Sequence, residues 1–101
     1  MRKPSLREIR EILEKNFSVI RERYNVRRIG IFGSYVRGEE GERSDVDILV
    51  DFEDDSNVSL LDLVDLETYL SDLLGVKVDL VDSGSLKGRI GEIIKREVIY
   101  I

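Results

Sequence analysis

Three aspartates have the types and spacing best suited to chemistry in this sequence. Asp45 and Asp47 are separated by one residue, and Asp79 stands between apolar residues in a later segment. Because side chains alternate across a strand, Asp45 and Asp47 would point to one side with Cα atoms roughly 7 Å apart. Asp79 could approach them from an adjacent strand only about 4.8 Å away. Three such carboxylates favour a hard divalent cation such as magnesium, and two ions could share them.

A simpler interpretation exists for an isolated pair of aspartates at this spacing. Asp45 would end a polar loop, and Asp47 and Asp51 would face solvent on a sheet with one buried side. We keep that interpretation for Asp51, because it lies too far along the strand to reach the other acids. Without a cation, neighbouring carboxylates repel one another and the pKa of at least one is raised. Because a bound cation would remove this repulsion, the spacing of Asp45 and Asp47 favours an ion site.

Gly33 and Ser34 follow a strand-like segment and precede a short helix-like one. Free amides at a helix start and a serine hydroxyl could bind phosphate, although a turn glycine and an N-cap serine are the simpler alternative. Neither GxxxxGK[ST] nor GxGxxG occurs, which excludes a P-loop and a dinucleotide fingerprint. Arg37 and Lys87 could complete a phosphate shell, and ordinary solvation is the simpler interpretation of each.

Helices and strands that must position these residues alternate along the chain. The apolar periodicity predicts helices over 5–24, 59–75 and around 86–94, strands over 26–32, 46–52 and 76–81, and an edge strand or tail over 98–101. Ser5 and Ser59 begin capping boxes. The buried stripe of the second long helix is predicted to be Leu60, Leu63, Val64, Leu70, Leu73 and Leu74. Tyr35 and Tyr69 are predicted to pack.

Composition limits both the domain organisation and the chemistry. With 101 residues and 42% apolar content, the chain supports one core, so we expect a single domain over 1–101. No stretch approaches the ~20 apolar residues that span a bilayer, and the first residues lack a signal-peptide centre. We therefore expect a cytoplasmic protein without membrane contact. The absence of cysteine and histidine leaves carboxylates, hydroxyls and cations to do any chemistry.

Charge is unevenly distributed. Residues 1–30 carry nine basic and four acidic side chains, whereas residues 39–67 carry one basic and twelve acidic ones. Such an acidic surface repels a phosphate backbone, so direct nucleic-acid binding is disfavoured.

The combination of GSYVRG, SDVDILVDF and a later VDLV resembles the signature of the DNA polymerase β-like nucleotidyltransferases. It is most similar to the minimal nucleotidyltransferases, the MntA-type antitoxins that accompany HEPN toxins. The resemblance covers nearly the whole chain and implies an α/β (α+β) fold, with a small mixed sheet flanked by helices. It also implies an ATP-binding transferase in which Gly33 and Ser34 hold triphosphate. Arg37, one turn beyond Ser34, is the cofactor-binding candidate that the sequence adds to this pair. Asp45, Asp47 and Asp79 would then bind Mg²⁺, with two ions expected, and form the catalytic set.

The resemblance further implies transfer of AMP to a tyrosine of the cognate HEPN toxin, a ribonuclease with which the chain would form a hetero-oligomer. Asp79 would help to activate the incoming hydroxyl, and Ser34 would be a phosphate ligand rather than a nucleophile. The alternative is a non-catalytic antitoxin that binds ATP and magnesium and neutralises the toxin by occlusion. Transfer to a small molecule or an RNA end is disfavoured by chain length and acidic charge.

Overall fold

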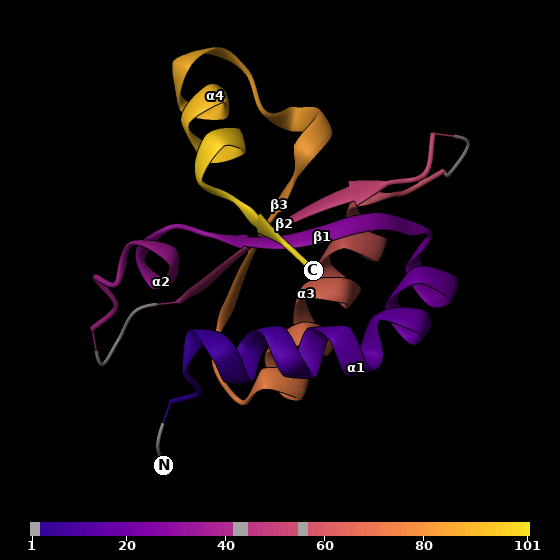
Figure 1. Cartoon of the computed structure of the whole chain (residues 1–101). Coiled ribbons are helices and arrows are strands. Elements are labelled where there is room, and N and C mark those ends of the chain that lie inside the picture. The colour runs from indigo at the N-terminus through magenta and orange to yellow at the C-terminus, as the bar shows by residue number, and fades with distance from the viewer. Residues whose placement is uncertain (1–2, 42–44, 55–56) are drawn as a thin grey trace.

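The computed structural model describes residues 3–41, 45–54 and 57–101. Its elements follow the order α1 (Leu6–Tyr24), β1 (Val26–Phe32), α2 (Ser34–Arg37), β2 (Val46–Phe52), α3 (Leu60–Leu74), β3 (Val78–Asp82), a 3₁₀ turn η1 (Ser83–Ser85), α4 (Gly88–Glu97) and β4 (Ile99–Tyr100). The strands form one mixed sheet in the order β3-β2-β1-β4. Helices α1 and α3 cover one face, and α4 rises from the other (Figure 1). The predicted small mixed sheet flanked by helices is confirmed.

Local signals begin and end the long helices as predicted. Ser5 caps α1 by accepting from the Glu8 amide at 3.2 Å, and the Glu8 carboxylate accepts from the Ser5 amide at 3.1 Å. Ser59 and Asp62 form the same reciprocal box at the start of α3. Such boxes satisfy backbone N–H groups that the first helical turn leaves free.

The register of the sheet gives its two faces different characters. Strand β1 pairs antiparallel with β2, and β2 pairs parallel with β3. One face carries Ile29, Ile31, Ile48, Val50, Val46, Leu80 and Val78, all buried. The opposite face carries Phe32, Asp47, Asp79, Leu49, Val81, Arg28 and Asp51 at directly paired positions. Alternation along each strand therefore separates the core from the side that bears the acids.

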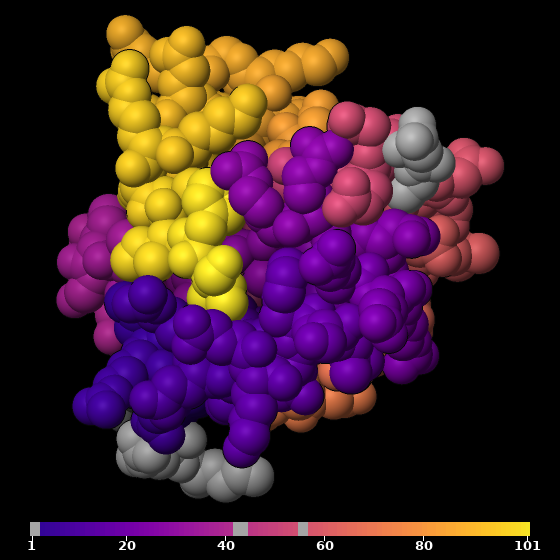
Figure 2. Space-filling view, turned by 45° about the vertical axis from the view of Figure 1, so that its right-hand side comes forward, coloured from indigo at the N-terminus to yellow at the C-terminus, as the bar shows by residue number. Residues whose placement is uncertain are grey.

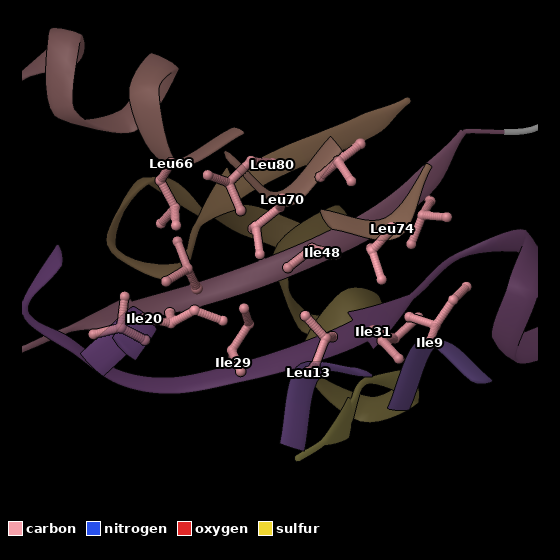
Figure 3. Packing of buried hydrophobic residues seen from close by; sticks show 14 of the residues in the cluster. Ile9, Leu13, Ile20, Ile29, Ile31, Ile48, Leu66, Leu70, Leu74 and Leu80 are labelled. Atoms are coloured by element: carbon pink, nitrogen blue, oxygen red, sulfur yellow. The ribbon is translucent and has the colours of Figure 1, made fainter. Parts of the chain in front are cut away.

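The core lies between the apolar face of the sheet and the two long helices. Side chains from α1, the sheet and α3 point toward one another, including Leu13, Ile31, Ile48 and Leu70 (Figure 3). The apolar residues whose helical spacing predicts α1 are Leu6, Ile9, Leu13, Phe17, Ile20 and Tyr24. Four of them, Ile9, Leu13, Ile20 and Tyr24, are buried, and Leu6 and Phe17 pack against the core. No helix in the described ranges is both long and apolar enough to cross a membrane.

The stripe predicted for α3 was wrong in its first half. Leu60 and Val64 are 75% and 53% exposed. The predicted Leu70 and Leu74 are buried, and so is Leu66, which the prediction did not include. Leu63, in the same part of α3, packs against the core. Apolar spacing alone does not decide which side of a helix with apolar residues all round becomes the buried one.

The C-terminal third differs from the prediction in its boundaries. Strand β3 begins at Val78, two residues later than expected, where its amide donates to the Ser71 hydroxyl at 3.0 Å. Helix α4 continues to Glu97. The segment predicted as an edge strand or a tail is a strand, because Ile99 and Tyr100 pair antiparallel with β1.

Candidate active site

A cavity of about 330 Å³ opens between α4 and the acid-bearing face of the sheet. Its polar lining comprises Gly33, Arg37, Asp47, Asp79 and Glu97, and its apolar lining comprises Phe32, Val81, Leu86, Ile90, Ile93 and Ile94. The polar group comes from the end of β1, from α2, β2 and β3, and from the last residue of α4, and the apolar group comes from β1, β3, α4 and the residues just before α4. One side of the cavity therefore suits charged groups and the other an apolar or aromatic body.

Asp47 occupies the centre of the polar side. It lies opposite Phe32 on β1 and opposite Asp79 on β3. Burial, and then the neighbouring carboxylates of Asp79 and Asp45, raise the pKa of Asp47 above its ordinary value. Arg37 opposes this shift in pKa, and Glu97 adds to it. The site thus concentrates negative charge around one half-buried carboxylate.

The acids fit a divalent cation through Asp47 and Asp79. Both line the cavity from adjacent parallel strands, and carboxylate oxygens are the donors that magnesium prefers. Asp45 lies just before β2, and its carboxylate is 3.9 Å from the Lys77 ammonium. Over the described parts of the chain, no three acidic side chains already stand together as an ion site. Asp45 therefore lies near Asp47 and Asp79 but does not form a three-carboxylate ion site with them.

Gly33 is placed where no other residue fits. Its backbone has φ 79° and ψ −151°, a conformation that residues with a Cβ rarely adopt. A Cβ at this position would collide with the Asp47 carboxylate. Absence of a side chain therefore lets the backbone of Gly33 lie directly against the acid.

Ser34 begins α2 next to Gly33 and is half-buried, but it does not line the cavity. Arg37, at the end of that single turn, does line it. Lys87 precedes α4, is exposed and lies outside the lining. Four of the six predicted site residues thus surround one cavity, and the other two, Ser34 and Asp45, flank it in sequence.

Asp51 has a separate setting, as expected. Its carboxylate accepts from the Ser83 hydroxyl at 2.9 Å and lies 3.4 Å from the Arg28 guanidinium and 3.8 Å from that of Arg27. Tyr35 is buried, and Tyr69 packs at 5.8 Å from the Tyr24 ring centroid. These residues support the fold around the site.

Glu97 is the polar cavity residue that the sequence did not indicate. It ends α4, far from the motifs along the chain, and its carboxylate accepts from the Gly33 amide at 2.7 Å. The Arg37 guanidinium donates to both of its oxygens, at 3.0 and 3.1 Å. A glutamate at the end of an amphipathic helix has no local signal that distinguishes it from a solvated one.

A family model described as a nucleotidyltransferase domain matches residues 6–101. The chain belongs to the nucleotidyltransferase domain family. Its similarity to a known adenylyltransferase is extensive: it is 55% identical over 97 residues to the protein adenylyltransferase MntA of Thermococcus cleftensis, covering 96% of both chains. The protein is therefore a nucleotidyltransferase enzyme, with relatives of the MntA type.

Solved structures of nucleotidyltransferases agree with this fold. A protein assigned as a minimal nucleotidyltransferase superposes with a TM-score of 0.78 at 40% identity, and the match covers 94% of each chain. A toxin-antitoxin crystal structure containing AMP-PNP superposes with a TM-score of 0.66 at 25% identity, covering 91% of this chain and 68% of that one. The resemblance inferred from the GSYVRG and SDVDILVDF motifs is confirmed at the level of family and fold.

Proposed function

We propose that this protein is a magnesium-dependent protein adenylyltransferase that acts as an antitoxin by transferring AMP from ATP to a tyrosine of a cognate HEPN toxin. The observation that carries the proposal is the convergence of Gly33, Arg37, Asp47 and Asp79 on one cavity. Its relative from Thermococcus bears the adenylyltransferase name over nearly the same length. A similar fold occurs in a toxin-antitoxin structure with an ATP analogue. We further propose that residues 1–101 form one domain and act in the cytoplasm.

The backbone of Gly33 and the hydroxyl of Ser34 would hold the triphosphate, with Arg37 supplying positive charge. Backbone N–H groups and a guanidinium are suitable donors to phosphate oxygens. Asp47 and Asp79 would hold the metal, and Asp45 would join them from the end of its loop. Magnesium, when bound, would neutralise charge that develops on the phosphates. No covalent enzyme intermediate is required.

The transfer itself is a displacement at the α-phosphorus of ATP. The tyrosine oxygen forms a bond to that phosphorus. At the same time the bond between the α-phosphorus and the oxygen that bridges it to the β-phosphorus breaks, and pyrophosphate leaves. The tyrosine proton passes to Asp79, the acid nearest to solvent among the cavity carboxylates. Positioning of the two reactants contributes a large part of such rate enhancements. The apolar side of the cavity would exclude water from the reacting atoms.

The decisive experiment is intact-mass analysis of the cognate HEPN toxin after co-expression with this protein. The wild type should add one or more AMP units to the toxin, and the double variant Asp45→Asn with Asp47→Asn should add none. Asp72→Asn, an exposed acid on α3, is the matched control and should retain the product. Transfer by the double variant at the wild-type rate would overturn the assignment of these acids.

The second candidate function is a binding antitoxin that silences its toxin without chemistry. The position of Asp45 favours it, since that carboxylate lies 3.9 Å from the Lys77 ammonium and the described residues hold no group of three acids arranged around an ion site. Cell protection by the double aspartate variant, without added mass on the toxin, would support this candidate instead.

A further inference from the structure

We infer that Glu97 is an internal competitor of the triphosphate: its carboxylate occupies the Gly33 amide and the Arg37 guanidinium until the nucleotide displaces it. The inference rests on the proposed function, because it takes the triphosphate as the displacing anion. It concerns a residue that acts on the phosphate donors and not on the reacting atoms. Glu97 is therefore a positioning residue.

The contacts of Glu97 are those of a bound oxyanion. One carboxylate oxygen accepts from a backbone N–H at 2.7 Å, and the guanidinium of Arg37 reaches both oxygens at 3.0 and 3.1 Å. Only 19% of the Glu97 side chain is exposed. Charge-assisted hydrogen bonds of this kind are roughly twice as strong as neutral ones. The arrangement is therefore a built anion site filled by the chain itself.

Gly33 explains why the site is filled. Gly33 is buried, so its amide would be costly to leave without an acceptor. Glu97 satisfies that amide and at the same time pairs with Arg37. A phosphate oxygen could make the same bonds, but a carboxylate and a phosphate cannot both occupy them. Nucleotide binding and the Glu97 contacts are therefore mutually exclusive.

The position of Glu97 in the fold favours release. It is the last residue of α4, a helix in which Gly91 is the one buried residue. Ile90 and Ile93 on the same helix are 72% and 50% exposed, so little apolar packing holds α4 against the sheet. The space-filling view shows the C-terminal segment standing out above the rest of this face (Figure 2). The exposed turns of α4 can therefore open at low cost, and Glu97 can leave the donors by side-chain rotation while the following strand β4 stays paired with β1.

Glu97 also sets the charge balance of the cavity. It lines the cavity with Asp47 and pairs with Arg37, the cation of the polar lining, which also pairs with Glu39 at 3.2 Å outside the cavity lining. When triphosphate enters, Arg37 would donate to the phosphate oxygens in place of the Glu97 carboxylate. The released Glu97 would then add its charge to that of Asp47 and Asp79. A ligand that binds only when Glu97 has left the Gly33 amide and Arg37 must offset the free energy of those contacts. Its apparent affinity is therefore lower than its affinity for the open site.

The test measures binding of tripolyphosphate in the presence of magnesium by calorimetry, since this probe contains the phosphates without base, sugar or transfer chemistry. Glu97→Gln retains the shape and an oxygen acceptor for the Gly33 amide but loses the charge. We expect it to bind tripolyphosphate about five to ten times more tightly than the wild type. The reason is that the neutral amide competes less strongly than the Glu97 carboxylate for the Gly33 amide and Arg37. Adenosine should bind both proteins equally.

Glu92→Gln is the matched control, because it removes one charge from the exposed face of the same helix. It should change the affinity less than twofold. The Arg37→Gln background supplies a second test. If Glu97 competes for Arg37, the gain from Glu97→Gln should shrink in that background to about twofold, whereas general charge repulsion would leave the gain unchanged.

Equal or weaker tripolyphosphate binding by Glu97→Gln, with measurable binding by the wild type, would overturn the inference and leave the proposed function intact. A full gain in the Arg37→Gln background would also overturn it, in favour of long-range repulsion. If neither protein binds tripolyphosphate or ATP, the proposed nucleotide site is wrong and the inference fails with it. Circular dichroism of each variant verifies the fold.

Discussion

Asp47 combines partial burial with two acidic neighbours, and its pKa is raised as a result. A carboxyl that binds its proton more tightly when folded favours the folded state at low pH. Its contribution falls as pH increases from its ordinary pKa of 3.8 through the raised value, and stays low above it. At pH 7 the ionised Asp47 therefore opposes folding unless a cation is present.

Asp47→Asn should accordingly stabilise the protein in chelator at pH 7, because it removes the charge that burial and the neighbouring acids disfavour. Magnesium should raise the thermal midpoint of the wild type more than that of the variant, because it relieves the repulsion only where the charge exists. Thermal denaturation with and without magnesium, at pH 7 and near pH 3, measures both effects. Asp72→Asn retains Asp47 and should therefore respond to magnesium and to pH as the wild type does. A magnesium response in Asp47→Asn as large as that of the wild type would refute the explanation.

Gly33→Ala should disrupt the site through two additive causes. The backbone conformation of Gly33 costs an L-residue roughly 1–3 kcal/mol, and the new Cβ would collide with the Asp47 carboxylate. Gly75→Ala is the matched control, because Gly75 has φ +70° with open space around it. Chemical denaturation should show a loss for both variants that is larger for Gly33→Ala, and only Gly33→Ala should lose AMP transfer. Equal losses with retained transfer would contradict the close approach to Asp47.

At the scale of elements, α1 and α4 differ in how they are anchored. Helix α1 has a capping box and four buried residues, whereas α4 has no side-chain cap at its start and buries Gly91 alone. Local opening is governed by such contacts. The free energy of local opening should therefore be clearly lower for α4 than for α1.

Amide hydrogen exchange should be at least tenfold faster in α4 than in the central turns of α1, because α4 can open without unfolding the core. Mass spectrometry of peptides covering 88–97 and 9–20 measures this difference. Tripolyphosphate with magnesium should leave exchange in α1 unchanged. Exchange in α4 as slow as in α1 would show that α4 is held by the global fold, and would count against release of Glu97 through movement of the helix.

At the scale of the whole molecule, the last residues join the active site to the centre of the sheet. Strand β4 pairs with β1 at Gly30 and Ile31, and the Ile101 amide donates to the Ile29 carbonyl at 2.9 Å. This return of the chain places Glu97 over the cavity. Gly30 permits it, since a Cβ there would lie 2.6 Å from the Val98 side chain and 3.0 Å from the Ile99 carbonyl.

Gly30→Ala should therefore destabilise the protein by roughly 1–3 kcal/mol, the range for overpacked sites. Adding Val98→Ala should recover part of this loss, because it removes the nearest side-chain atom and leaves the Ile99 carbonyl in place. The free energy of unfolding in denaturant, measured for both single variants and the double variant, gives the coupling. Strict additivity would mean that the two residues do not meet as the structure has them.

Much of the fold could be predicted from the sequence because its signals are local. Capping residues and apolar periodicity defined α1 within one residue and located β1 and β2 at their observed bounds. The same periodicity misassigned Leu60 and Val64, since apolar residues occur on more than one side of α3 and only packing decides which side is buried. Alternation along β2 also predicted that Asp47 shares a face with Asp79, which the register of the parallel pair fulfils.

The sequence by itself determined the family, the acid pair and the turn that carries Gly33, because each depends on residue types at short spacing. Only the tertiary structure decided that Arg37 lines the cavity, that Asp45 faces Lys77, and that Glu97 occupies the anion donors. Sixty-four residues separate Glu97 from the Gly33 amide. Their contact depends on how β4 packs back against β1, and no local pattern encodes a contact made by the return of the chain.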